Sequence, residues 1–290
     1  MKKKEMSRPW LSVLFLTLWT ALRILPLPAA AALMSWIMRT FAEKLTRQQT
    51  IRENLSKAFP DMPPAKIRET GRAVAGNLGV IAAELRHIHK FRGGVARGAL
   101  TFTGDEQLAL AKKGPVIFVG PHQWNWEIMP LFYSEHGIRV TTIYGKLGNA
   151  LMDRTILAQR RKTGANYVEK RKAVRAVMSA LESGGSLAFI IDQRVKSGVP
   201  VKFFGRESLI TGLPARLAIR YKCPIVPMDM ERREGHRFHM MFGKPVYPPA
   251  EPDAQAEQQM MQAVAGQLEQ IIRRSPETWF CSRKRWPDKA

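Results

Sequence analysis

Short apolar runs alternate with stretches of helical periodicity from about residue 101 to residue 242, and this alternation limits the possible folds more than any other feature. The runs of strand length are Val116–Val119, Arg139–Tyr144, Leu187–Ile191, Ile225–Met228 and Arg237–Phe242. Helices are predicted between them at Asp105–Lys113, Asn125–Glu135, Ala150–Lys162, Arg171–Ser183 and Thr211–Tyr221. Strands that alternate with helices predict an α/β fold with a central, largely parallel sheet flanked by helices. Ligands bind such sheets at the carboxyl ends of the strands.

Further helices are predicted on either side of this region. Asp61-Met62-Pro63-Pro64 is typical of a helix start, because proline is tolerated in the first turn, and apolar residues at helical spacing follow to about Gly93. Asp253 is expected to begin a last helix that ends at Arg274. The 290 residues contain no internal repeat and no low-complexity segment, so the sequence indicates no second globular domain.

The N-terminal segment is first basic and then apolar. Lys2–Lys4 and Arg8 precede an apolar run from Trp10 to Leu25, and a second run, Ala29–Phe41, follows two prolines. The first run has 16 residues, fewer than the roughly 20 that a spanning helix needs. We expect residues 1–45 to form a hydrophobic membrane anchor that either crosses the bilayer weakly or lies at its cytoplasmic face. A cleaved signal peptide and a buried helical hairpin are the alternatives.

The charge balance indicates anionic partners. Forty-six Lys and Arg residues against 24 Asp and Glu residues give a net charge of +22. Such a surface favours nucleic acid, an anionic membrane, or an acidic substrate or carrier. The two cysteines, Cys223 and Cys281, lie in unrelated contexts, so they predict no disulfide framework, no metal site and a reducing compartment.

The strongest functional signal is His122, which follows the strand Val116–Val119 and precedes Glu127 by five positions. On one helix, five residues would turn the two side chains about 140° apart. The two side chains can meet only if His122 lies in the turn before a helix and Glu127 in its first turn, with Asn125 as the N-cap. Glu127 would then accept a hydrogen bond from one imidazole nitrogen, and the other nitrogen could take a proton from a hydroxyl. The alternative is a loop histidine and a solvated acid favoured by the helix dipole.

A second polar group follows another strand. Asp192-Gln193-Arg194 comes directly after Ile190-Ile191 and is predicted to lie at a strand's carboxyl end. Arg160, Arg194 and Arg206 are candidates for binding phosphate, because guanidinium groups match phosphate oxygens bidentately. Asp192 could orient one of these arginines. The alternative for each arginine is a solvated surface position.

Taken in order, these motifs resemble the bacterial lipid A late (secondary) acyltransferases of the lauroyl/myristoyl type, which are related to the glycerol-phosphate acyltransferases and their H-x4-D signature. The resemblance covers nearly the whole chain. One departure is Trp124, which stands where the family usually has glycine. The matching motifs are His122-x4-Glu127, Tyr144 with Asn149, Arg160-x3-Gly164, Asp192-Gln193-Arg194, Phe203-Phe204-Gly205-Arg206, Pro214-Ala215-Arg216, Pro224-Ile225-Val226-Pro227, Trp279 and Arg285-Trp286.

The resemblance implies that residues 46–290 form an acyltransferase domain with the glycerol-phosphate-acyltransferase fold, at the cytoplasmic face of the bacterial inner membrane. It implies transfer of an acyl chain from an acyl carrier protein thioester to a hydroxyl of a phosphorylated lipid A precursor, without a cofactor or metal. The motif contains no serine or cysteine, so direct transfer is favoured over an acyl-enzyme. The implied catalytic residues are His122 as general base and Glu127 as its orienting partner, and the implied substrate-binding residues are Asn125, Arg160, Asp192, Arg194 and Arg206.

Two other functions remain open from the sequence. The same chemistry could serve another acceptor, such as a lysophospholipid, an ornithine or aminoacyl lipid or a phosphoglycolipid, or could use acyl-CoA. A basic protein that binds nucleic acid or anionic lipid without catalysis would show interleaved aromatic and basic residues on a sheet face, or a helix-turn-helix. The sequence shows neither pattern, so nucleic acid is not expected as a partner.

Overall fold

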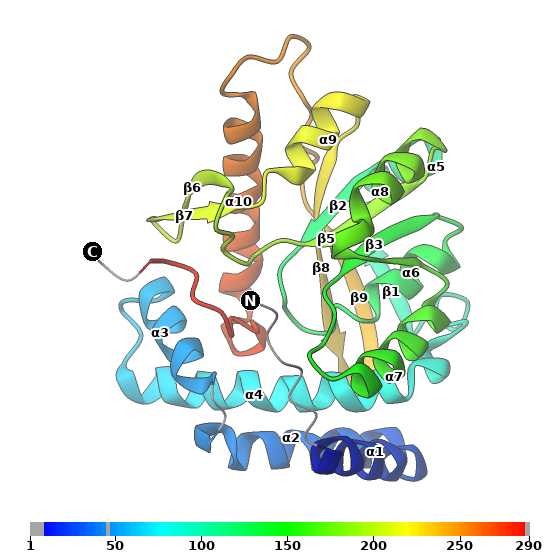
Figure 1. Cartoon of the computed structure of the whole chain (residues 1–290), viewed down its shortest axis with the longest axis vertical. Helices are drawn as coiled ribbons and strands as arrows, with labels where there is room; N and C mark the ends of the chain where they lie inside the picture. The colour runs from blue at the N-terminus through cyan, green and yellow to red at the C-terminus, as the bar shows by residue number, and fades with distance from the viewer. Residues whose placement is uncertain (1–8, 45–46, 288–290) are drawn as a thin grey trace.

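A computed structural model describes residues 9–44 and 47–287, which are built around a central sheet with helices packed on both sides (Figure 1). The basic residues Lys2–Lys4 and Arg8 of the predicted anchor lie outside the described residues. The expected α/β class with a largely parallel sheet is confirmed.

The described residues form one seven-stranded sheet with the order β1-β9-β8-β2-β5-β3-β4. Neighbouring strands are parallel throughout except for the antiparallel pair β8–β9. The strands are β1 Leu100–Thr103, β2 Ile117–Gly120, β3 Val140–Tyr144, β4 Asn166–Glu169, β5 Ser186–Ile190, β8 Ile225–Arg233 and β9 Arg237–Phe242. A separate antiparallel hairpin consists of β6 Val199–Phe203 and β7 Arg206–Ile210.

The central strand β2 is buried on both of its faces. Ile117 and Val119 contribute to one hydrophobic core, and Phe118 contributes to the other, because successive side chains of a strand point to opposite faces. Helices α8 Ala173–Glu182, α9 Leu213–Tyr221 and α10 Ala256–Arg274 supply residues to the first core. Helices α5 Asp105–Lys113 and α6 Met129–Glu135 supply residues to the second. A parallel strand covered on both faces has no polar alternation, which is why a plain apolar run predicted it.

Most predicted elements appear within a few residues of their expected limits, but four strands, β1, β4, β6 and β7, were not predicted. Strands β1 and β4 have four residues each, and the β6–β7 hairpin lies in a stretch where burial alternates along the chain. Helix α6 also begins at Met129 rather than at Asn125. The segment 125–128 forms a turn in which the Asn125 side chain accepts from the Glu127 N–H (3.0 Å).

The predicted N-terminal anchor consists of two short helices, α1 Pro9–Ile24 and α2 Leu27–Thr40, which lie beneath α4 Pro64–Arg86 (Figure 1). Helix α2 packs closely on α4, where a β-carbon at Gly79 would collide with the Met34 carbonyl. Within the described ranges, no helix combines the length and apolar character that a bilayer crossing requires. The expected membrane-anchor helix is therefore not supported as a spanning element, because Pro26 separates the two apolar runs into helices of 16 and 14 residues.

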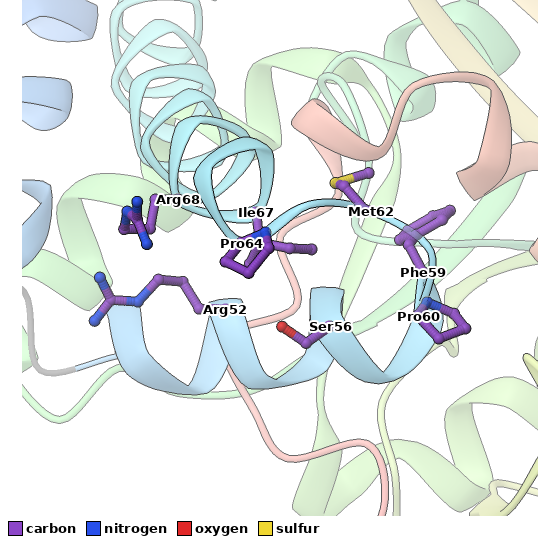
Figure 2. A pocket seen from close by; sticks show the side chains of 8 residues that line it. All are labelled: Arg52, Ser56, Phe59, Pro60, Met62, Pro64, Ile67 and Arg68. Atoms are coloured by element: carbon purple, nitrogen blue, oxygen red, sulfur yellow. The ribbon is translucent and has the colours of Figure 1, made fainter.

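A surface pocket of about 460 Å³ lies between α3 Gln48–Ala58 and the start of α4 (Figure 2). Phe59, Met62 and Ile67 form its apolar wall, and the side chains of Arg52 and Arg68 lie together at its other end. None of the residues that the sequence predicted for the functional site lines this pocket. The predicted site residues His122 and Asp192 lie instead at the carboxyl ends of β2 and β5.

Candidate active site

His122 and Asp192 meet because β2 and β5 are neighbours in register. Gly120 of β2 pairs with Ile190 of β5, and the Ile191 N–H continues the ladder to the Gly120 carbonyl (3.0 Å). Each functional residue lies two positions beyond this pair, at the carboxyl end of its strand. The His122 Nδ1 is 2.6 Å from the Asp192 Oδ1. Sequence analysis placed both residues at strand ends, and the structure brings them into direct contact.

The carboxylate that contacts His122 is therefore Asp192, and the predicted hydrogen bond between Glu127 and the imidazole is wrong for this structure. Both oxygens of Glu127 bind Arg160, with Arg160 Nε donating to Oε2 (2.7 Å) and Nη2 donating to Oε1 (2.6 Å). Trp126 Nε1 donates to the same Oε1 (3.1 Å). Glu127 lies in a turn before α6 rather than in its first turn, so its side chain reaches the end of α7 Ala150–Arg160 instead of the imidazole.

Glu127 and Arg160 form a closely matched buried ion pair. Their side chains are 7% and 19% exposed, and the two parallel hydrogen bonds have the fork geometry typical of a guanidinium with a carboxylate. Burial alone would lower the pKa of Arg160, but the charge and hydrogen bonds of Glu127 raise it above its usual range. The pair adjoins the histidine through Trp126, whose ring contacts the imidazole edge to face with centroids 5.2 Å apart. Arg160 is thus part of the same site as His122.

Asn125, which was predicted to bind the substrate, is bonded within the protein in this structure. Its side chain is fully buried, and its Nδ2 donates to Glu84 Oε2 of α4 (2.7 Å) while its Oδ1 accepts from the Glu127 N–H. Glu84 is also bound bidentately by Arg232 of β8 (2.6 and 2.8 Å) and contacts His236 Nδ1 (2.7 Å). Burial would raise the pKa of Glu84, but Arg232, His236 and Asn125 hold it below its usual value. A buried ionic network therefore fixes the turn that carries His122 and Glu127.

The turn is also held through the backbone of Trp124, which has a left-handed φ of 48°. The Trp124 carbonyl accepts from Asn77 Nδ2 (3.1 Å), and the Asn77 Oδ1 in turn accepts from Arg232 Nη1 (2.8 Å). A left-handed conformation is unfavourable for a tryptophan and persists only where neighbouring groups fix it. This explains how Trp124 can occupy the position at which the family usually has glycine.

The C-terminal tail closes the site from the other side. Asp192 Oδ2 accepts from Trp279 Nε1 (2.8 Å) and from Arg285 Nη2 (2.7 Å), and the Phe280 N–H donates to the His122 carbonyl (2.7 Å). Burial would raise the pKa of Asp192, but the charges of Arg285 and His122 and the hydrogen bonds hold it well below its usual range. A carboxylate accepts hydrogen bonds, so in the 2.6 Å contact the Nδ1–H of His122 donates to Asp192 Oδ1.

The two remaining predicted residues lie apart from this arrangement. Arg194 is exposed in the loop after β5, two positions beyond Asp192, and the described residues offer it no hydrogen-bond or ion-pair partner. Arg206 is exposed at the start of β7, and its Nε donates to the Lys57 carbonyl of α3 (3.1 Å). Arg206 therefore joins a hairpin to a helix. The role of Arg194 as a phosphate ligand stays a prediction.

Sequence reasoning missed Gln193, Trp126, Trp279 and Arg285 as members of the site. Gln193 was visible as the neighbour of Asp192, and its side-chain nitrogen lies 3.4 Å from His122 Nε2. Asp192 was expected to orient one of three arginines, but the arginine that it binds is Arg285. No local signal marks a partner 93 positions away in the chain.

The contacts of the imidazole decide which of its nitrogens is open to chemistry. Asp192 fixes the imidazole through Nδ1, so Nε2 is the nitrogen that can accept a proton. The His122 side chain is 19% exposed, which leaves it accessible to a substrate. Among the described residues, the hydrogen-bond partners of this imidazole are Asp192 and Gln193, and neither is a serine or cysteine. The described structure therefore places no protein nucleophile against His122.

Comparison with known proteins agrees with this chemistry. A search of curated proteins finds no match. The family model described as "Bacterial lipid A biosynthesis acyltransferase" matches residues 1–288, which is nearly the entire chain. By this match, the chain belongs to the bacterial lipid A biosynthesis acyltransferase family.

Proposed function

We propose that this protein transfers a fatty acyl chain from an acyl carrier protein thioester to a hydroxyl of a phosphorylated lipid A precursor, with His122 as the general base. The family supplies the acyltransferase activity in lipid A synthesis. The observation that carries the mechanism is the 2.6 Å contact between His122 Nδ1 and Asp192 at the ends of β2 and β5. The donor, the roles of the residues and the association with the membrane are parts of the proposal.

In the proposed reaction, the acceptor hydroxyl approaches Nε2 of His122, where Gln193 now lies. His122 removes the hydroxyl proton as the oxygen attacks the thioester carbonyl, and Asp192 stabilises the imidazolium that forms. The tetrahedral intermediate carries an oxyanion that needs hydrogen-bond donors. Arg160 suits this role or the binding of a phosphate, because Glu127 engages its Nε and Nη2 and leaves Nη1 without a partner among the described residues. Collapse of the intermediate breaks the C–S bond, and the imidazolium of His122 returns the proton to the sulfur, so the donor leaves as a thiol and the base is regenerated.

We also propose that the protein docks on the membrane through α1 and α2 without crossing it. Val13 and Leu14 of α1 and Trp36 of α2 are 64%, 50% and 61% exposed. Leu151 of α7 extends the apolar surface, because the neighbouring Asn149 binds Ser12 of α1 (2.8 Å). Exposed apolar side chains on short helices, in a chain with a net charge of +22, are typical of an interfacial helix on an anionic bilayer. Such docking would bring the end of α7, with Arg160, towards the lipid acceptor.

The test is acyl transfer from acyl-carrier-protein thioesters to a tetra-acylated lipid A precursor in detergent. His122→Ala is expected to lose about a thousandfold in rate, the middle of the range for general-base catalysis. Asp192→Asn should lose a comparable factor, because the amide can donate to Nδ1 and favour the wrong tautomer. His89→Ala, at an exposed histidine near the end of α4, is the matched control and should keep full activity.

Several outcomes would change the proposal. Full activity of folded His122→Ala would refute the general-base role. Product from acyl-CoA but not from acyl carrier protein would reassign the donor. Product on lysophospholipids or aminoacyl lipids, with none on the lipid A precursor, would reassign the acceptor and leave the base in place.

A further inference from the structure

The strongest unexplained feature beyond the proposed reaction is a buried arginine in the C-terminal tail. Arg285 is 1% exposed, and its Nη2 donates to Asp192 Oδ2. Its Nε and Nη1 are buried without a hydrogen-bond partner among the described residues. A buried cation with unsatisfied donors costs stability, and an apolar side chain of the same volume would anchor the tail better. The charge of Arg285 therefore requires an explanation other than anchoring.

Several hydrogen bonds join the tail around Arg285 to α3 and β7. Asn54 of α3 donates to the carbonyls of Cys281 (2.7 Å) and Arg283 (2.8 Å) and accepts from the Arg285 N–H (3.1 Å). The Arg285 carbonyl accepts from Ser208 Oγ of β7 (2.7 Å). Trp279 lies under the Arg285 guanidinium, 5.5 Å from its ring centroid. These bonds hold two donors, Trp279 Nε1 and Arg285 Nη2, on one oxygen of Asp192.

The groups around His122 come from the end of β5, the turn before α6 and the C-terminal tail. Asp192 and Gln193 come from the end of β5, Trp126 from the turn before α6 and Phe280 from the tail. Arg285 is the charge behind Asp192, and the compensated Glu127–Arg160 pair lies behind Trp126. The Cys281 thiol is buried, which raises its pKa to about 12, so it remains neutral. The charges of Asp192 and Arg285 therefore offset each other beside the imidazole.

We propose that Arg285 and Trp279 are positioning residues of the general base, which hold Asp192 in place and balance its charge so that His122 stays neutral and able to accept a proton. The inference rests on the proposed function of His122. Without Arg285, the buried carboxylate would lose its permanent counter-charge and would favour the imidazolium, because the neighbouring negative charge would then be uncompensated. The tail is in this sense a part of the active site, although neither residue touches the reacting atoms.

The first experiment compares the pH dependence of kcat/KM for the wild type, Arg285→Met and Arg285→Lys. In Arg285→Met, the pH at which activity is half lost on the acid side should rise by about one unit, the lower end of the effect of a close charge. Arg285→Lys keeps the charge and should restore most of this midpoint. Arg283→Met is the matched control, since Arg283 is an exposed arginine of the same tail, and it should leave the profile unchanged.

The second experiment needs no substrate and so separates this inference from the proposed function. Nitrogen-15 NMR of labelled histidine, with the His122 signals assigned by their loss in His122→Gln, reports which ring nitrogen carries the proton. The wild type should show the Nδ1-protonated neutral form, and Arg285→Met should convert to the imidazolium at a higher pH. Trp279→Phe removes one donor and should perturb the Nδ1 signal and lower kcat about tenfold, the value of a hydrogen bond to a charged group.

The proposal is overturned if folded Arg285→Met loses activity with an unmoved acid midpoint and an unchanged His122 titration, because both residues would then be structural only. If Arg285→Met does not fold, the test is made with Trp279→Phe. Unchanged His122 Nδ1 signals and full activity in Trp279→Phe would refute the proposal. Wild-type protein that transfers no acyl chain but gives the expected NMR response would count against the proposed function and support the role of the tail.

Discussion

For the ion pair between Glu127 and Arg160, the contribution to the free energy of unfolding can be measured separately from the contribution to acyl transfer. Three variants are compared with the wild type: Glu127→Gln, Arg160→Met and the double variant. Glu127→Gln leaves a guanidinium that is 19% exposed without its two charged hydrogen bonds. Loss of one partner of a buried pair costs about 3 to 5 kcal/mol, and the partial exposure of Arg160 places the expected loss near about 3 kcal/mol.

The double variant should recover most of this loss. Its side chains no longer include an uncompensated charge, and buried pairs replaced by neutral groups of similar volume are often neutral in stability. We therefore expect the free energy of unfolding to return to within about 1 kcal/mol of the wild type. Acyl transfer should not recover, because the proposed donor on Arg160 is absent.

The assay is urea unfolding followed by tryptophan fluorescence, with unchanged slopes as the condition for comparing free energies. Activity is measured on the same preparations. Glu69→Gln, in the exposed pair with Lys66, is the matched control and should leave the unfolding midpoint unchanged. A loss below about 1 kcal/mol in Glu127→Gln would refute the reasoning that the pair is desolvated. Recovery of activity together with stability in the double variant would show that the pair is only structural.

Two further predictions concern stability and the membrane. Burial raises the pKa of Asp229 from 3.8 to about 6, despite the opposing charge of Arg274. The ionised carboxylate therefore lowers the free energy of unfolding by about 3 kcal/mol above pH 6. This destabilisation disappears as the pH falls towards 3.8, because Asp229 is then protonated in both the folded and the unfolded state. Asp229→Asn should therefore be more stable than the wild type at pH 8 and equal to it near pH 4 in urea unfolding, whereas a difference independent of pH would contradict this cause. Trp36→Ser with Leu14→Ser should weaken flotation with vesicles that contain anionic lipid, while Val174→Ser, at a residue of α8 that is 72% exposed, should not; equal binding of all three proteins would place the membrane contact elsewhere.

Local patterns predicted the scaffold well. The strands β2, β5 and β8 were visible as apolar runs because a strand covered on both faces needs no polar residues. Helix α5 and strand β9 have the limits that the sequence predicted, since turn residues and periodicity mark them within a few positions. Short edge elements such as β4 escaped, because four residues carry too little periodicity to be distinguished from a loop.

The site was predicted in part. His122 and Asp192 were placed at strand ends, but their contact depends on β5 lying next to β2, although β3 and β4 lie between them in the chain. The spacing of five residues favoured Glu127 as the partner of His122, and this was wrong because α6 begins later and turns the carboxylate towards Arg160.

The sequence by itself determined the α/β alternation, the turn that carries His122 and the family, because these depend on residues that are close together in the chain. Tertiary structure alone decided which charges meet. The pairs His122–Asp192, Glu127–Arg160 and Asp192–Arg285 are 70, 33 and 93 residues apart. Their selection follows from strand order, register and the course of the tail, which are set by burial of the whole core and by the requirement that each buried charge find a partner.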